Sequence, residues 1–268
     1  MKFIYIVLLI PLFCLSQNKQ FEYTVYYNTD SPLIKKGYLI PYLKKNKTNY
    51  YEVFSKNIFD QENNEDEITE VIMIGDKDLV KRTNIDYTDQ YIYSLETVTF
   101  TDSLFLVKEK IPDFNWNIKH KDTLKIGDFI CNKATLDFRG RSYTAWYSTD
   151  IPLSYGPWKF SGLPGLIIEI YDNTRRYEWS LSRISNISID EKELSRSKAD
   201  STVSLKEFIT NKEKRFKKRQ RQMVQNIKTR SDRGVFVSDV KITKLRTSKE
   251  LIFEWEKEEE IEEETKED

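Results

Sequence analysis

Two side chains of this sequence have the chemistry needed for nucleophilic catalysis, a thiol and an imidazole. Cys131 could act as a nucleophile if the fold brought the imidazole of His120, the one histidine of the chain, to its sulfur. Lys119 and Lys121 flank this histidine and disfavour its protonated form. A general base must accept a proton, so these neighbours favour a surface histidine without a catalytic role. A free cysteine is most often buried and inert. The sequence therefore assigns no catalytic residue, and a cysteine-dependent enzyme that uses Cys131 stays as the alternative.

Two weaker signals of catalysis or metal binding do not change this assignment. Residues 195–198 (SRSK) have the spacing of serine–lysine hydrolases, but they lie in a polar stretch without the companion motifs. The acidic run at residues 61–67 could hold a hard cation, but it has neither EF-hand spacing nor a bend-forming glycine. We therefore predict no metal site and no cofactor.

A loop rich in glycine and proline, residues 155–165, combines aromatic and cationic side chains that could bind a ligand. A rigid backbone lowers the ordering cost of binding, and a nearby turn adds two arginines. The candidate ligand- or partner-binding residues are Trp158, Lys159, Phe160, Arg139 and Arg141. Trp158, Lys159 and Phe160 would form a rim that receives an anionic or lipid-like partner. In the alternative interpretation, Trp158 and Phe160 fold back and pack against the sheet as core residues.

A basic segment at residues 212–221 offers a second candidate surface. Its net charge is +6, against −8 for residues 254–268. Ser204 and Glu207 form a capping box, which predicts that an amphipathic helix begins near Leu205 and continues through the basic segment. The cations that could contact a membrane surface are Lys212, Lys214, Arg215, Lys217, Lys218, Arg219 and Arg221. They could also pair with the acidic residues 254–268 or remain solvated.

The charge of the whole chain argues against nucleic acid as a partner. The sequence has 43 basic and 43 acidic residues, so its formal net charge is zero and no global field attracts a polyanion.

Short strand-like segments separated by turn signals must position these candidates. The predicted strands are residues 21–27, 38–43, 50–55, 69–74, 79–82, 91–95, 97–100, 104–107, 129–138, 141–148, 165–171, 177–184, 235–245 and 251–255. This spacing is typical of an antiparallel meander. We therefore expect a mainly β protein of the β-rich α+β class, with a strongly curved antiparallel sheet or half-barrel packed around the one amphipathic helix.

The predicted hairpin at residues 129–148 has a register that can be checked. Its two-residue loop is Arg139-Gly140, which places Leu136 opposite Tyr143 on the drier face of the hairpin. Strict alternation then places Cys131 on the more polar face, which weakens the expectation of a buried thiol.

A predicted turn leads into the most apolar strand of the chain. In Leu163-Pro164-Gly165, proline presets φ at the second position and glycine accepts the positive φ of a type II turn. We assign a structural role to Gly162, Pro164 and Gly165, and a buried strand to the apolar residues that follow.

The N-terminal residues are typical of an exported protein. Met1-Lys2 and the apolar run at residues 3–15 predict a signal peptide at residues 1–16, cleaved between Ser16 and Gln17. A lipoprotein and an uncleaved N-terminal anchor are the alternatives. Cleavage would remove Cys14 and leave Cys131 as the one cysteine, so no internal disulfide could form. The expected organisation is one β-rich domain at residues 17–255 and an acidic disordered tail at residues 256–268.

The segment CNKATLDFRGRSYTAWYSTDIPLSYGPWKFSGLPGLIIEIYDN resembles the signature of the GLPGLI family of secreted proteins of Bacteroidota, with the naming hexapeptide at residues 162–167. The resemblance implies a β-rich protein of the envelope, located in the periplasm or at the cell surface, and it implies no catalytic residue. Together these observations predict an exported, non-enzymatic binding or accessory protein that holds an apolar ligand or envelope partner in its curved sheet. A purely structural envelope protein is a further alternative.

Overall fold

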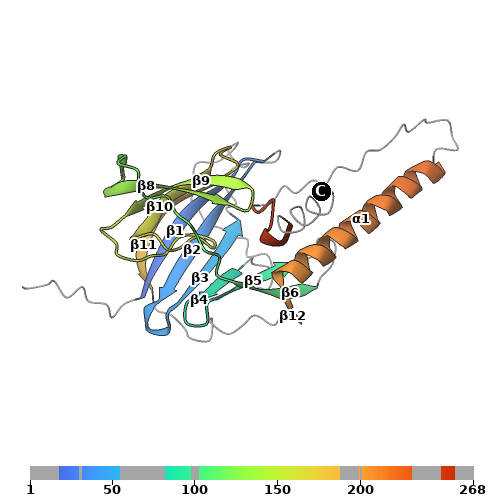
Figure 1. Ribbon diagram of the computed structural model, residues 1–268, viewed down its shortest axis with the longest axis horizontal. Coiled ribbons are helices and arrows are strands. Elements are labelled where there is room, and N and C mark those ends of the chain that lie inside the picture. The colour runs from blue at the N-terminus through green and yellow to red at the C-terminus, as the bar shows by residue number, and fades with distance from the viewer. Residues whose placement is uncertain are drawn as a thin grey trace, which may run out of the picture.

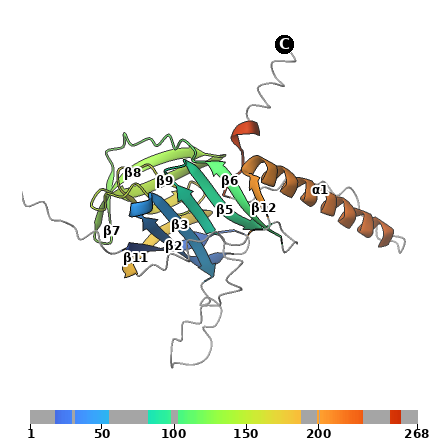
Figure 2. The same ribbon diagram turned by 90° about the horizontal axis from the view of Figure 1, so that it is seen from below.

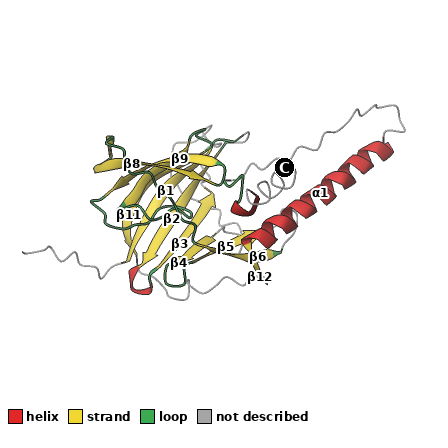
Figure 3. Ribbon diagram, viewed as in Figure 1, coloured by secondary structure: helices red, strands yellow, loops and turns green. Residues whose placement is uncertain are grey.

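The computed structural model describes residues 18–29, 32–54, 82–97, 103–187, 199, 201–230 and 249–256. Within them lie twelve strands, one short 3-10 helix and the long helix α1 (Leu205–Arg230) (Figure 3). The strands are β1 (Asn18–Tyr27), β2 (Leu33–Tyr42), β3 (Lys47–Phe54), β4 (Arg82–Asp86), β5 (Tyr91–Thr97), β6 (Leu104–Lys110), β7 (Thr123–Ile126), β8 (Phe129–Phe138), β9 (Arg141–Ser148), β10 (Leu166–Asp172), β11 (Tyr177–Ile187) and β12 (Ser201–Ser204). The 3-10 helix η1 (Leu43–Lys45) joins β2 to β3.

Several predicted features lie outside the described residues. They are the signal peptide, the acidic run at residues 61–67, the strands at residues 69–74 and 235–245, the SRSK sequence and the acidic residues 257–268. The strand predicted at residues 251–255 is wrong, because these residues form no strand and end in a helical turn at residues 254–256. Among the described residues, no helix has the length and apolar character that crossing a bilayer requires.

The described strands form one sheet with the order β12-β6-β5-β4-β3-β2-β1-β11-β10-β9-β8-β7 (Figure 1). Two antiparallel meanders, β1 to β6 and β7 to β11, join where β1 pairs with β11. The short strand β12 is the exception, since it runs parallel to β6. A mainly β, antiparallel, unclosed sheet is confirmed.

The connection between the two meanders requires the sheet to curve. In a flat sheet β6 and β7 would lie about 48 Å apart, at about 4.8 Å per strand. The connecting residues 111–122 could span about 45 Å at most when fully extended. They are not fully extended, since Phe114 and Trp116 pack on the core and Asn117 pairs with Thr135 of β8. The sheet therefore curves, and the β8–β9 hairpin reaches across toward β6 (Figure 2).

The β8–β9 hairpin has the predicted register. Leu136 pairs with Tyr143 and Phe138 with Arg141 across the turn Arg139-Gly140, whose φ angles of 48° and 80° are those of a hairpin turn with both central residues left-handed. The prediction for Cys131 is wrong, because this residue is buried in the core. Burial alternates from Phe138 to Ala134 and then loses this alternation, since Cys131, three positions from Ala134, is also fully buried.

The helix α1 begins at Leu205 as predicted, and the backbone N–H of Glu207 donates to the Ser204 hydroxyl at 3.2 Å. It does pack against the sheet, but only through its first turns, where Leu205 and Phe208 contact Val107 of β6 and Phe253. Beyond these turns it extends away from the sheet (Figure 1). The interior of the curve is filled by core side chains of the strands and of the loop between β9 and β10.

Candidate functional site

The predicted rim of the loop at residues 155–165 lies inside the molecule. Trp158, Lys159 and Phe160 are 8%, 4% and 0% exposed, so the expectation that they form an exposed rim is wrong and the core interpretation is confirmed for both aromatics. The indole of Trp158 stacks on that of Trp179 at 6.2 Å between ring centroids, and Phe160 meets Tyr143 edge to face at 4.9 Å. The apolar area of these rings outweighs the cost of the left-handed φ of 56° at Trp158.

Lys159 is buried together with its aromatic neighbours because two carboxylates form ion pairs with its ammonium. Its ammonium contacts Glu109 of β6 and lies 3.0 Å from Glu250 Oε1. Arg139, at the hairpin turn, lies 2.8 Å from Glu109, contacts Glu250 and lies 2.9 Å from Glu254. We call Glu109, Arg139, Lys159 and Glu250 the ion cluster. It joins β6, the β8–β9 turn, the loop and residue 250, which are far apart in the sequence.

The pKa values of Lys159 and Glu250 both favour the charged form of the side chain. Burial lowers the pKa of Lys159, but Glu109 and Glu250 outweigh burial, so the pKa lies above its ordinary value. Burial alone would raise the pKa of Glu250, whereas Lys159 and Arg139 hold it below its ordinary value. The cluster is therefore a set of matched buried charges.

Arg141 has a separate structural partner. Its guanidinium lies 3.0 Å from the buried carboxylate of Asp172 and 4.8 Å from the centre of the Tyr177 ring. The same carboxylate accepts from the backbone N–H of Tyr177 at 2.8 Å. Arg141 thus fixes the β10–β11 turn against the hairpin.

A second charged site lies next to the ion cluster, and sequence reasoning missed it. The Lys249 ammonium lies 2.8 Å from Glu52 Oε1 and 5.2, 5.3 and 4.9 Å from the ring centres of Tyr27, Trp158 and Trp179. We call Tyr27, Glu52, Trp158 and Trp179 the ammonium site. Burial would raise the pKa of Glu52, but Lys249 and Lys35 outweigh burial and lower it to about 2. The site can hold a cation by charge and by ring faces together.

The hexapeptide at residues 162–167 has a structural role that differs from the predicted turn. The left-handed residue is Gly162, with φ of 93°, and not Gly165, so the type II turn prediction is wrong. Gly165 is required for another reason. A Cβ there would lie 2.2 Å from the carbonyl oxygen of Ser148, the residue that pairs with Leu166 at the start of β10. Leu163, Leu166 and Ile167 are buried in the core beside it.

Cys131 and His120 do not form a nucleophile and base. The thiol is fully buried, its Sγ lies 3.8 Å from the Phe129 carbonyl oxygen, and burial raises its pKa to about 11. The imidazole Nε2 of His120 instead lies 3.0 Å from the Thr135 hydroxyl. Within the part of the chain that the structure describes, no group of acidic, histidine and cysteine residues could hold a metal ion.

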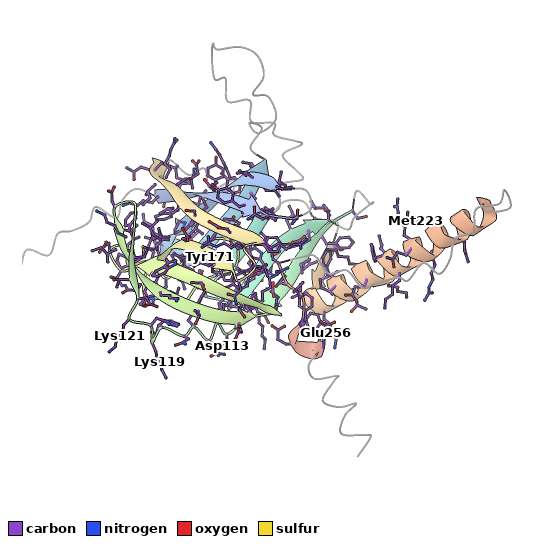
Figure 4. The ribbon with its side chains drawn as sticks, turned by 90° about the horizontal axis from the view of Figure 1, so that it is seen from above. Asp113, Lys119, Lys121, Tyr171, Met223 and Glu256 are labelled. Atoms are coloured by element: carbon purple, nitrogen blue, oxygen red, sulfur yellow. The ribbon has the colours of Figure 1, made fainter. Side chains whose placement is uncertain are left out.

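The cations of the basic segment lie on the part of α1 that extends from the sheet. Lys214, Arg215, Lys217 and Lys218 are exposed there, together with two large apolar side chains, Phe216 and Met223. Figure 4 shows Met223 on this extended part, well away from the strands.

Comparison with known proteins gives no functional assignment. A family model described as "Protein of unknown function (Porph_ging)" matches residues 139–169, which run from the hairpin turn into β10. No curated protein matches the chain. Among solved structures, PNGF-II in its P21 and C2 crystal forms is similar at 11% and 12% identity, with TM-scores of 0.47 and 0.49. Each match covers 72% of this chain and 32% of PNGF-II, so the chain spans about a third of that protein.

Proposed function

We propose that this protein is an exported, non-enzymatic accessory protein of the cell envelope that binds an anionic membrane surface through α1. The observation that carries the proposal is the exposed part of this helix, which combines an apolar stripe with a dense set of cations. Among the described residues, the first turns of α1 pack against the sheet. Farther along the helix, Lys214, Arg215, Phe216, Lys217, Lys218 and Met223 are exposed.

The apolar stripe continues the face that docks on the sheet. Ile209 packs against the cluster that contains Leu205, Phe208 and Phe253. Phe216 and Met223 follow Ile209 at seven-residue spacing, which keeps all three on one side of an α-helix. Phe216 and Met223 are 47% and 57% exposed. Large apolar side chains that remain exposed on a helix beside cations are typical of helices that lie in a membrane interface.

The charge of the segment matches an anionic lipid surface. Residues 212–221 carry seven cations and one acidic side chain, Glu213. Each Lys or Arg near such a surface contributes about 1 kcal/mol to binding, and salt screens the attraction. The segment therefore supplies several kcal/mol at low ionic strength, enough for reversible binding when the apolar stripe contributes as well.

Export and envelope location rest on the N-terminal sequence and on the resemblance to the GLPGLI family. The segment that carries this resemblance overlaps the family-model match at residues 139–169. In the structure the hexapeptide is a packing element, which agrees with a naming signature that has no catalytic role. The apolar ligand expected inside the curved sheet is replaced in this proposal, because Trp158 and Phe160, which were expected to receive it, are buried in the core cluster.

The test is co-sedimentation of the chain from Gln17 onward with vesicles. Vesicles of phosphatidylcholine alone are compared with vesicles that also contain phosphatidylglycerol, at low and physiological salt. We expect binding to the anionic vesicles only, reduced by salt. Phe216→Ser/Met223→Ser and Lys217→Gln/Lys218→Gln should each weaken binding by about fivefold or more, since each removes about 1–2 kcal/mol.

A matched control separates a specific helix from net charge. Lys44→Gln/Lys45→Gln removes two cations at η1 and should leave vesicle binding unchanged. Equal loss with this control, or equal binding to neutral vesicles, would overturn the proposal. If a chain that ends at Glu256 bound vesicles much more tightly than the full chain, the acidic residues 257–268 would be the occupant of the helix instead.

A further inference from the structure

The segment at residues 249–256, here called the docked segment, lies on the sheet in the manner of a bound peptide. Its backbone is held by the β8–β9 hairpin. The Tyr143 hydroxyl donates to the Lys249 carbonyl oxygen at 3.0 Å, and the backbone N–H groups of Leu251 and Ile252 donate to the Arg139 carbonyl oxygen at 2.8 and 3.1 Å. These bonds recognise a main chain, whatever its side chains are.

Side chains of opposite charge on successive residues enter two neighbouring sites. Lys249 enters the ammonium site, and Glu250 enters the ion cluster between Arg139 and Lys159. The indole of Trp158 lies between the two sites, with its ring centre 5.3 Å from the Lys249 ammonium and 5.2 Å from the Lys159 ammonium. The sheet thus recognises both the identity and the order of the pair.

The ammonium site is arranged by contacts that do not involve the docked segment. Tyr27 and Tyr50 donate their hydroxyls to the Glu52 carboxylate, and Trp158 stacks on Trp179. The groups that meet Lys249 come from β1, β3, β11 and the β9–β10 loop. A site preorganised in this way has a low ordering cost for any ligand of the same chemistry.

The hairpin turn also packs closely on the side chains of the docked segment. A Cβ at Gly140 would lie 3.0 Å from Leu251 Cβ, so a larger residue at this left-handed position would displace the docked segment.

We propose that this end of the sheet is a recognition site for a polypeptide segment that carries lysine followed by glutamate, occupied in this chain by Lys249-Glu250. An external polypeptide with this pair is the ligand class. The covalent link gives the internal pair an effective concentration of roughly millimolar, so a partner binds when the internal pair is displaced or removed. The inference does not depend on membrane binding by α1.

The first experiment tests the ammonium site with a small probe. Lys249→Ala removes the atoms of n-propylammonium, so this ion should bind the variant and raise its Tm by about 2–4 °C at saturating concentration. The wild-type Tm should not change, and n-propanol, which lacks the charge, should not stabilise the variant. Lys249→Ala/Glu52→Gln should lose the effect. An equal Tm shift with n-propanol, or no shift with n-propylammonium, would overturn the ammonium site.

The second experiment tests recognition of a polypeptide. A fluorescently labelled peptide of residues 249–256 is titrated into the full chain and into Lys249→Ala/Glu250→Ala, with anisotropy as the readout. We expect about tenfold or tighter binding to the variant, because the internal competitor is weakened. A peptide with lysine and glutamate exchanged should bind at least about tenfold more weakly, since each charge would then meet its own sign.

A replacement variant and two further results separate recognition of the Lys-Glu pair from a purely structural role. If Lys249→Ala/Glu250→Ala does not fold, Lys249→Met/Glu250→Gln, which keeps both side-chain lengths, replaces it. A folded variant that does not bind the peptide would show that residues 249 and 250 have a structural role only. Equal affinity for the original and exchanged peptides would also overturn the proposal. Neither result would bear on vesicle binding by α1.

Discussion

Glu109 of β6 lies 2.8 Å from Arg139 at the β8–β9 turn, an ion pair that joins the two meanders of an unclosed sheet. No strand pairing connects β6 directly to the β8–β9 hairpin, since β6 and β8 are nine positions apart in the strand order. Both side chains are about 5% exposed, so water does little to screen the pair. The ends of the curve are held together by charge as well as by packing.

Removal of the Glu109 charge should destabilise the fold strongly. Glu109→Gln leaves Arg139 and Lys159 with one fewer buried partner, and the expected loss is about 3–5 kcal/mol in the free energy of unfolding. Guanidinium denaturation followed by tryptophan fluorescence measures it. Arg175→Gln breaks the exposed Arg175–Glu178 pair at 2.9 Å and should cost less than about 1 kcal/mol. Equal losses in the two variants would contradict a special role for the ion cluster.

Stability should fall in acid in a way that depends on Glu52. Its pKa of about 2 in the folded protein lies below the unfolded value of about 4.3. Glu52 therefore contributes stability above about pH 4.3, and this contribution of about 3 kcal/mol is lost as the pH falls toward 2. Denaturation curves from pH 7 to pH 2 should show a smaller acid loss for Glu52→Gln than for wild type. Equal losses of stability in acid for wild type and Glu52→Gln would contradict this role of Glu52.

Gly165→Ala should prevent stable folding. The new Cβ would lie 2.2 Å from the Ser148 carbonyl oxygen, a backbone atom of the residue that pairs with Leu166 of β10, so the backbone of β9 would have to shift. We expect a loss of more than about 4 kcal/mol. Gly127→Ala is the control, because open space surrounds that position and the cost is the left-handed φ alone, about 1–2 kcal/mol. Circular dichroism melts compare them, and similar melting temperatures would disprove the close-approach explanation.

Trp158→Ala should act on stability before it acts on any ligand. The indole is buried against Trp179 and Phe160, so truncation should cost about 3–5 kcal/mol. Phe216→Ala, on the exposed part of α1, should change stability by less than about 0.5 kcal/mol. Urea denaturation of both variants is the measurement. A fully stable Trp158→Ala protein would restore the original interpretation of this residue as an exposed binding side chain.

The Cys131 thiol should be unreactive in the native protein. With a pKa of about 11 and no exposed surface, it has a thiolate fraction of about one in a thousand at pH 8 and no access for a reagent. Ellman's reagent should modify it only after denaturation, and Cys131→Ser should leave vesicle and peptide binding unchanged. Rapid native modification would reopen the cysteine-enzyme alternative.

Local patterns predicted the local parts of this fold. The β8–β9 register follows from a two-residue loop and an alternating strand, and the start of α1 follows from Ser204 and Glu207, because each depends on residues close in sequence. The hairpin prediction failed at Cys131, where alternation breaks within the strand. The turn prediction failed at Gly165, because glycine there makes room for another strand and does not supply a positive φ.

The candidate site was harder to predict because its partners are distant in the sequence. Lys159 carries no local signal that Glu109 and Glu250 will neutralise it, so a cation in a glycine-rich loop was interpreted as exposed. Glu52 and Lys249 are 197 positions apart, and neither stands in a motif. The cluster of aromatic residues around residue 158 did indicate a special place, although not a buried one.

Because the chain is synthesised from its N-terminus, the docked segment is made after the residues that bind it. Glu52, Glu109, Arg139 and Lys159 all precede Lys249 and Glu250 in the chain, with 111 positions between Arg139 and Glu250. A growing chain that lacks residue 250 therefore has two cations facing Glu109 alone. Such long-range contacts form slowly, since chain closure must precede them. The molecule therefore reaches its full stability only after Lys249 and Glu250 have been synthesised and have bound their partners.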